Sequence, residues 1–283
     1  MKREPWKPLT INMYSETKSM DLIVIGVINI HTIMKTSLKA GVTNVVSEYT
    51  EKFSGSALHV AVNASLLKAE VGIISPVGRD AVGLMDVLKR HQVDFSHVVL
   101  SSQKNPNFIE LYAARRHYTL YYKGALMDFN PEKFEKSYLK KAKAVHICFP
   151  DQEVTDSLVT LAKKAKVLTS VDGACAEADA DIVFTEGNEQ GKNTIVTDFE
   201  KGIICNGKEI PVFKNDTYHK EGVKDAFIAA FLTRYVKSEH AEHAALYGSC
   251  AAYLCSQSEK KVLTCTKEEL DALFEEKIEE LQI

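Results

Sequence analysis

Apolar residues follow two different periods along this chain, and the alternation of the two predicts an α/β fold. Residues 21–28 form a nearly continuous apolar run rich in Ile and Val. This pattern is typical of a strand covered on both faces, as the strands of parallel sheets are. Residues 57–64 instead carry small apolar residues at helical spacing, which lets a helix approach a sheet closely. Further strands are predicted at 71–75, 98–100, 145–149, 167–171, 181–184, 194–197, 202–205 and 209–213.

Helices are predicted between and after these strands. Asp80 is a suitable N-cap for a helix whose inward face includes Leu84 and Leu88. Asn130 and Pro131 predict another helix start, because proline is tolerated in a first turn. Further helices are predicted at 154–165, 223–236, 239–257 and 267–281. Strands alternating with helices of this length predict a three-layer α/β/α fold around a doubly wound, mostly parallel sheet.

Two segments do not fit that sheet. Residues 31–53 and 104–123 contain more polar, alternating strands, and we assign them to a small β-strand lid that projects from the main sheet. Residues 1–20 precede the first strong strand and are expected to form an N-terminal extension. Residues 21–283 are expected to form one domain together with the lid.

Charge and composition favour a small-molecule partner. The formal net charge is −3 and 45% of the residues are hydrophobic, so no broad attraction to nucleic acid or to an acidic membrane is expected. No apolar run is long enough to span a bilayer, and the first residues contain no signal-peptide core. None of the six cysteines stands in a CxxC pair, which favours reduced, buried thiols in a cytoplasmic protein.

The strongest local signal for chemistry is the start of the helix predicted at 223–236. Gly222 leaves backbone N–H groups free at that start, where the aligned peptide dipoles place roughly half a positive charge. Asp225, in the first turn, is positioned to take a proton from a bound alcohol while those N–H groups hold a phosphate. The simpler alternative is an ordinary helix start with a favourable acidic residue.

Four segments in order along the chain resemble the ribokinase-like (PfkB) family of carbohydrate and nucleoside kinases. The matching segments are 53–61 (FSGSALHVA), 76–83 (PVGRDAVG), 171–173 (VDG) and 222–227 (GVKDAF), and an Ala-rich helix at 243–254 follows at the expected distance. The resemblance extends from residue 21 to about residue 256. It implies a kinase that transfers the γ-phosphate of ATP to a hydroxyl group of a sugar, polyol or nucleoside.

The resemblance also implies roles for individual residues. Asp225 would be the general base, and the backbone of Gly222, Val223 and Lys224 would form the anion hole for the γ-phosphate. ATP would lie between the segment from Thr197 to Gly202 and the helix near Gly248. The substrate would lie near Gly55, beneath the lid. Mg²⁺ would bridge the phosphates of ATP, and Glu189 is the candidate metal ligand.

Departures from the family pattern indicate an altered substrate site. His31 stands where the family usually has an aspartate that binds substrate hydroxyls, and His59 stands where it usually has an asparagine. Both histidines are therefore candidate substrate ligands that would titrate near neutrality. Arg115, in the predicted lid hairpin, is a further candidate for an anionic group of the substrate, although a solvated turn is the simpler interpretation.

Other departures affect the nucleotide side. Phe199 stands in a segment where the family has a threonine-x-glycine motif, and Lys224 replaces the second glycine of the anion hole. These changes leave open a catalytically weak or inactive relative that binds a small ligand for a regulatory or structural role. A dinucleotide-binding protein of another class is disfavoured, because Gly26 after the first strand is isolated. Exposed lid strands also allow a homodimer formed edge to edge.

Overall fold

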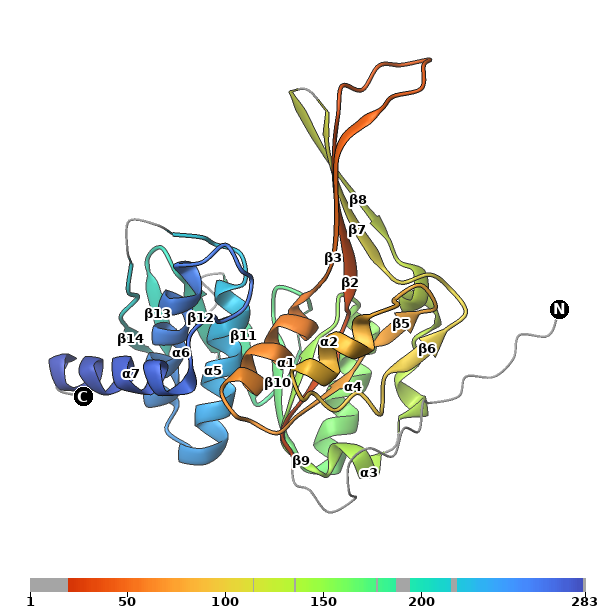
Figure 1. Ribbon diagram of the computed structural model, residues 1–283. Helices are drawn as coiled ribbons and strands as arrows, with labels where there is room; N and C mark the ends of the chain where they lie inside the picture. Colours follow the sequence, from red (N-terminus) through yellow and green to blue (C-terminus); the bar gives the residue numbers. More distant parts are fainter. Residues whose placement is uncertain are drawn as a thin grey trace.

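The computed structural model describes residues 20–113, 115–134, 136–176, 178–186, 194–214 and 218–281, and these form an eight-stranded sheet between helices, with a separate projecting arm (Figure 1). From edge to edge the sheet consists of β14 (Lys208–Ile210), β13 (Gly202–Cys205), β12 (Thr194–Asp198), β11 (Ile182–Thr185), β10 (Leu168–Asp172), β9 (Ala142–Cys148), β1 (Met20–Gly26) and β4 (Val71–Ile74). Neighbouring strands from β4 to β12 are parallel, whereas β13 and β14 are antiparallel additions. The predicted, mostly parallel sheet is confirmed.

Strand β1 shows why the apolar run near residue 21 is continuous. Its residues are buried on both faces, and successive side chains point to opposite sides of the sheet. Leu22 and Val24 pack into one core cluster, whereas Ile23 and Ile25 pack into the other. Burial of each such side chain contributes roughly 1.5–3 kcal/mol of transfer free energy. Two cores, one on each face, require two helical layers.

The helices form those layers. One face is covered by α1 (Ser56–Leu66), α2 (Leu84–Arg90), α5 (Val223–Ser238) and α6 (Ala241–Ser256), and the other by α3 (Lys136–Leu139) and α4 (Gln152–Ala165). Helix α7 (Lys267–Leu281) packs on α6 through Leu270 and Phe274. The three-layer α/β/α prediction is thus confirmed.

The predicted lid is a second sheet that projects from the main body (Figure 1). Within the described part of the chain it contains β3 (Val46–Ser54), β2 (Asn29–Thr36), β7 (Asn107–Ala113) and β8 (Arg116–Tyr122), in that order. Strands β3 and β8 form its edges, and β8 is exposed along its whole length. Strands β5 (Pro76–Gly78) and β6 (Val99–Ser101) form a separate, short parallel pair. In the sequence they follow β4 of the main sheet and precede β7 of the lid. The predicted N-terminal extension lies outside the described residues except for Met20, which opens β1.

Two predicted helix starts were wrong. Helix α2 begins only at Leu84, after Gly83 in the left-handed region with φ of 88°. Asp80 does not cap it, because its Oδ1 accepts the backbone N–H of Asn105 at 2.6 Å. After Asn130 the chain forms only a 3₁₀ turn, η2 (Pro131–Lys133), before the short α3.

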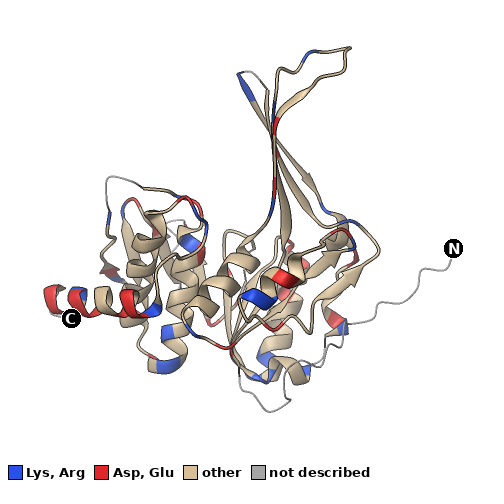
Figure 2. Ribbon diagram, viewed as in Figure 1, with Lys and Arg blue, Asp and Glu red and all other residues tan. Residues whose placement is uncertain are grey.

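Charges of both signs are distributed over the fold, and acidic residues are most frequent along α7 (Figure 2). Among the described helices, none combines the length and the apolar character needed to traverse a lipid bilayer.

Candidate active site

Helix α5 begins beyond the carboxyl ends of the parallel strands, the edge at which open α/β sheets bind ligands. Its N-cap is Gly222, with φ of 81° in the left-handed region. A Cβ at this position would lie 2.2 Å from the carbonyl oxygen of Lys261, so only glycine fits. No described side chain caps the helix. Its first N–H groups are therefore available to an anion.

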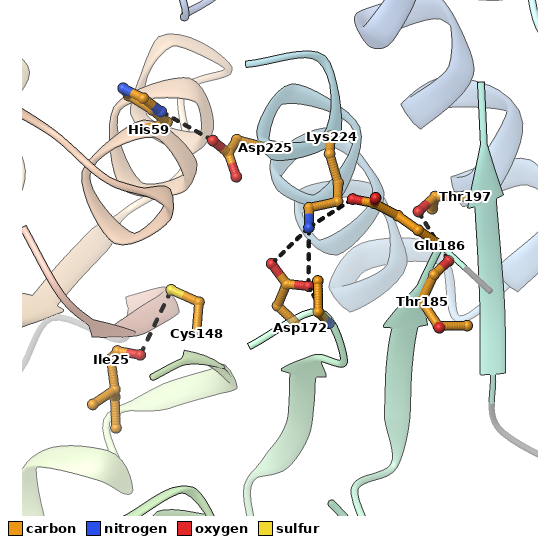
Figure 3. Close-up of polar contacts among 10 residues, drawn as sticks. Ile25, His59, Cys148, Asp172, Thr185, Glu186, Thr197, Lys224 and Asp225 are labelled. Atoms are coloured by element: carbon orange, nitrogen blue, oxygen red, sulfur yellow. Dashed lines mark hydrogen bonds and ion pairs between the residues drawn. The ribbon is translucent and has the colours of Figure 1, made fainter. Parts of the chain in front are cut away.

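Asp225 lies buried in the first turn of α5 and is held by His59 of α1. The distance between Asp225 Oδ2 and His59 Nδ1 is 2.9 Å (Figure 3). Asp225 Oδ1 is buried and has no hydrogen-bond partner among the described residues. Burial alone would raise the pKa of Asp225, but the hydrogen bond from His59 and the charges of His59 and Lys224 lower it below the usual range. The carboxylate is therefore ionised at neutral pH and can accept a proton.

Lys224 turns away from the helix axis toward the ends of β10 and β11 (Figure 3). Its Nζ lies 3.1 Å from Asp172 Oδ2 and 3.0 Å from Glu186 Oε1. Burial alone would lower the pKa of Lys224, but these two carboxylates raise it above its usual value. The second glycine of the expected anion hole is thus replaced by a fixed positive charge beside the helix start.

A hollow of about 300 Å³ adjoins Lys224 on the side of β12. Thr197 lines it, and its hydroxyl donates to the carbonyl of Thr185 at 3.1 Å. Phe199 also lines it and packs edge to face on Phe227, with ring centroids 5.8 Å apart. Gly202 lines a neighbouring hollow of about 360 Å³, and Asp198 borders both. Both hollows adjoin the segment from Thr197 to Gly202, and the predicted place of ATP stays a prediction.

Gly248 lies within α6 and is enclosed by α5. A Cβ at this position would lie 2.7 Å from the ring of Phe227. Close packing of the two helices therefore explains the glycine. Its predicted contact with ATP stays a prediction.

The base of the lid supplies further polar groups. His31 is buried on β2, with its Nε2 3.3 Å from Glu110 Oε2 and its ring edge on to Phe108. Burial, and then the charge of Lys261, lower the pKa of His31. Because the Lys261 backbone contacts Gly222, His31 and the start of α5 lie in the same region.

Gly55 forms the corner before α1, with φ of 114°. A Cβ there would lie 2.5 Å from the carbonyl oxygen of Val27. Gly55 therefore lets the end of β3 approach the segment after β1 closely, which sets the position of His59 one turn later.

The structure does not bring every predicted residue to this region. Arg115 is exposed in the turn between β7 and β8, at the far end of the lid hairpin. From Phe108, beside His31, strand β7 runs five residue steps to Ala113, or roughly 17 Å, before this turn. Arg115 of a single chain therefore lies far from His31. Glu189 lies outside the described residues.

Sequence reasoning missed several site residues. Ser54, Glu110 and Glu186 were not singled out, although each lies within 4 Å of a predicted site residue. Glu186 stands directly after β11, so its place at the carboxyl end of a parallel strand was the available signal. Ser54 and Glu110 carry no comparable local signal.

The described residues contain no cluster of three or more His, Cys, Asp or Glu side chains able to hold a metal ion. Mg²⁺ in kinases is bound mainly through the nucleotide phosphates, with one or two protein carboxylates. Asp172 and Glu186 are carboxylates near the helix start, and both are paired with Lys224. These residues fit a metal that enters with the nucleotide better than a metal cage built by the protein.

The chain resembles known kinases in sequence. The model of the family described as pfkB family carbohydrate kinase matches residues 19–186. A 2-dehydro-3-deoxygalactonokinase of Haloferax volcanii is 29% identical over 125 residues, a segment that covers 42% of this chain and 38% of that enzyme. The chain therefore matches less than two thirds of the length of this curated relative.

Solved structures with the same fold cover nearly the whole chain. The ribokinase of Arabidopsis thaliana superimposes with a TM-score of 0.75 at 16% identity, covering 90% of this chain and 99% of that chain. The nucleoside kinase of Methanocaldococcus jannaschii superimposes with a TM-score of 0.72 at 20% identity, covering 92% and 99%. At these identities the likeness establishes the fold.

Proposed function

The chain belongs to the pfkB family of carbohydrate kinases, and we propose that it transfers the γ-phosphate of ATP to a hydroxyl group of a sugar, polyol or nucleoside. The observation that carries the proposal is Asp225, a buried, ionised carboxylate in the first turn of α5 whose Oδ1 has no hydrogen-bond partner among the described residues, on a helix that no described side chain caps. A proton acceptor and an anion-binding helix start thereby lie within one turn of each other.

In this proposal the acceptor hydroxyl lies against Asp225 Oδ1. The hydroxyl oxygen attacks the γ-phosphorus as its proton passes to Oδ1, and the bond between the γ-phosphorus and the bridging oxygen breaks. ADP leaves with that electron pair. The N–H groups at the start of α5 hold the phosphoryl oxygens during transfer.

Lys224 adds a point charge to this arrangement. Its ammonium is fixed by Asp172 and Glu186, near the ends of β10 and β11. Mg²⁺ bound with the nucleotide would neutralise further phosphate charge. The hollow lined by Thr197 and Phe199 is the proposed nucleotide site.

The relatives suggest which acceptors to test first. The Haloferax volcanii relative is a 2-dehydro-3-deoxygalactonokinase, and the Arabidopsis thaliana ribokinase was solved with ribose and ATP. A panel should therefore contain pentoses, hexoses, sugar acids, polyols and nucleosides. ADP release with MgATP identifies the acceptor.

The Asp225→Asn variant tests the proposed base. We expect kcat to fall by about 10²–10⁴-fold, because the amide keeps the shape of the carboxylate but cannot take the proton. Asp151→Asn is a matched control, since Asp151 caps α4 and asparagine caps equally well. Near-normal turnover of Asp225→Asn would remove Asp225 from the role of base.

The ion cluster of Lys224, Asp172 and Glu186 favours a second candidate function. Both carboxylates are already paired with the single ammonium group of Lys224, which suits a relative that binds a small ligand without turnover. Thermal shift with ATP, with and without Mg²⁺, separates the two candidates. Stabilisation by a sugar alone, with neither nucleotide binding nor ADP release, would favour the non-catalytic candidate.

We also propose that a second copy of the chain contacts the lid. Among the described strands, β8 pairs only with β7 and so forms an open edge of the lid sheet, and it carries exposed Tyr118, Leu120 and Tyr122. Unpaired apolar edges of this kind favour association with another chain.

A further inference from the structure

Three buried side chains from separate elements form a row beside the proposed reaction centre. Ser54 ends β3, His59 lies in the first turn of α1, and Asp225 lies in the first turn of α5. His59 Nδ1 lies 2.9 Å from Asp225 Oδ2, and His59 Nε2 lies 3.5 Å from Ser54 Oγ. All three residues are more than nine-tenths buried.

The direction of the hydrogen bond follows from its partners. An ionised carboxylate can only accept, so Nδ1 of His59 carries a proton and donates it, whichever charge state the ring has. Nε2 faces Ser54, although 3.5 Å is at the outer limit of a hydrogen bond. Asp225 is thus the principal partner of the ring.

The backbone holds the ring in this place. Gly55 turns the chain sharply into α1, and the N–H of His59 donates to the Gly55 carbonyl at 3.1 Å. The side chain of His59 is 11% exposed, about as much as that of Asp225, so exposure does not separate their roles. The partners of the ring do, because Nδ1 is bonded to Asp225 and Nε2 faces Ser54, which leaves neither ring nitrogen directed at a ligand.

We infer that His59 is a positioning residue for the base and not a substrate ligand. Its Nδ1–H binds Asp225 Oδ2, so that Oδ1 alone meets the acceptor hydroxyl. The inference rests on the proposed function and assigns the step as follows: the acceptor proton passes to Oδ1, while Nδ1 keeps its own proton throughout. A carboxylate held by one oxygen is already oriented before the acceptor binds.

Three substitutions of His59 test the inference. Asparagine places its amide N–H near the position of Nδ1, whereas glutamine places its amide near the position of Nε2, and leucine offers neither. We therefore expect kcat of His59→Leu and His59→Gln to fall by about 10²-fold, with KM changed less than about threefold. His59→Asn should recover most of the lost kcat.

Other results would overturn the inference. An increase in KM at constant kcat in His59→Leu would make His59 a substrate ligand. Equal losses in the asparagine and glutamine variants would show that the position of the donor does not matter. Thermal unfolding of each variant identifies misfolding. If His59→Leu does not fold, the kcat values of His59→Asn and His59→Gln, whose side chains are both polar and similar in size, still test whether the position of the donor matters.

A second readout does not depend on turnover. The carboxyl ¹³C resonance of Asp225 can be titrated in each variant, and its pKa should rise in His59→Gln and His59→Leu but stay low in His59→Asn. Unchanged titration in all three variants would overturn the inference even if the enzyme is active. A wild-type protein without phosphotransfer would refute the proposed function, whereas this titration would still decide whether His59 holds Asp225.

The titration must be interpreted with the neighbouring charges in mind. Besides His59, the groups that interact with Asp225 come from five places: its own helix, α1, β9, the segment after β10, and α6. They are Lys224, Ser56, His146, Cys148, Cys175 and Cys255. None of them changes in the His59 variants, so a difference between variants reports the His59 contact.

Discussion

His146 is a fully buried ionisable side chain near the site. It lies within β9, and its Nδ1 is 2.9 Å from Ser170 Oγ. Nε2 has no hydrogen-bond partner among the described residues. Burial lowers the pKa of His146 to about 4, although the charges of Asp172 and Asp225 oppose the shift. The imidazole is therefore neutral in the folded protein at neutral pH.

This burial predicts a loss of stability in mild acid. The unfolded chain binds the proton of His146 near pH 6.5, whereas the folded chain binds it only near pH 4. Stability therefore falls as the pH is lowered through this window, by roughly 2 kcal/mol between pH 7 and pH 5. In urea unfolding at both pH values, His146→Asn should show a smaller loss, with the exposed His240→Asn as control. An unchanged pH dependence in His146→Asn would contradict the prediction.

Helices α5 and α6 show how packing and intrinsic propensity compete. Helix propensity alone predicts that Gly248→Ala stabilises an α-helix, by about 1 kcal/mol. The added Cβ would, however, lie 2.7 Å from the ring of Phe227. That ring is itself enclosed by Phe184, Phe199 and Phe231, so it has little room to move away from an added methyl group.

We therefore expect Gly248→Ala to destabilise the protein by about 1–3 kcal/mol. Denaturant unfolding, with the midpoint and slope compared between wild type and variant, measures the change. The sign of the effect is decisive, because propensity and packing predict opposite signs. A stabilised variant would mean that α6 can move away from α5 at little cost.

At the scale of the whole molecule, the lid creates the exposed surface that a partner would cover. Its edge strand β8 is exposed throughout, and the main sheet contributes nothing to that edge. We expect the wild-type protein to sediment at twice the mass of one chain. Leu120→Lys, which places a charge at a 53% exposed apolar position, should shift the equilibrium to monomers.

The matched control for the lid is Met127→Lys. Met127 is similarly exposed and apolar, but it lies in the 3₁₀ helix η1 (Gly124–Asp128), outside the lid strands. This variant should leave the sedimentation unchanged. A wild-type protein that is monomeric at every concentration tested would exclude the lid contact.

The sequence by itself determined the class of fold and the family, and both predictions are confirmed. The spacing of apolar residues that identifies strands and helices depends on residues only a few positions apart, and so does the helix start at Gly222–Asp225. A short stretch of sequence is therefore enough to predict them. Only the tertiary structure decided which charges meet. His59 and Asp225 are 166 positions apart, and Lys224 and Asp172 are 52 apart. Such contacts form only when the sheet brings distant strand ends and helix starts to one edge, and for the same reason Asp80 binds Asn105 instead of capping α2.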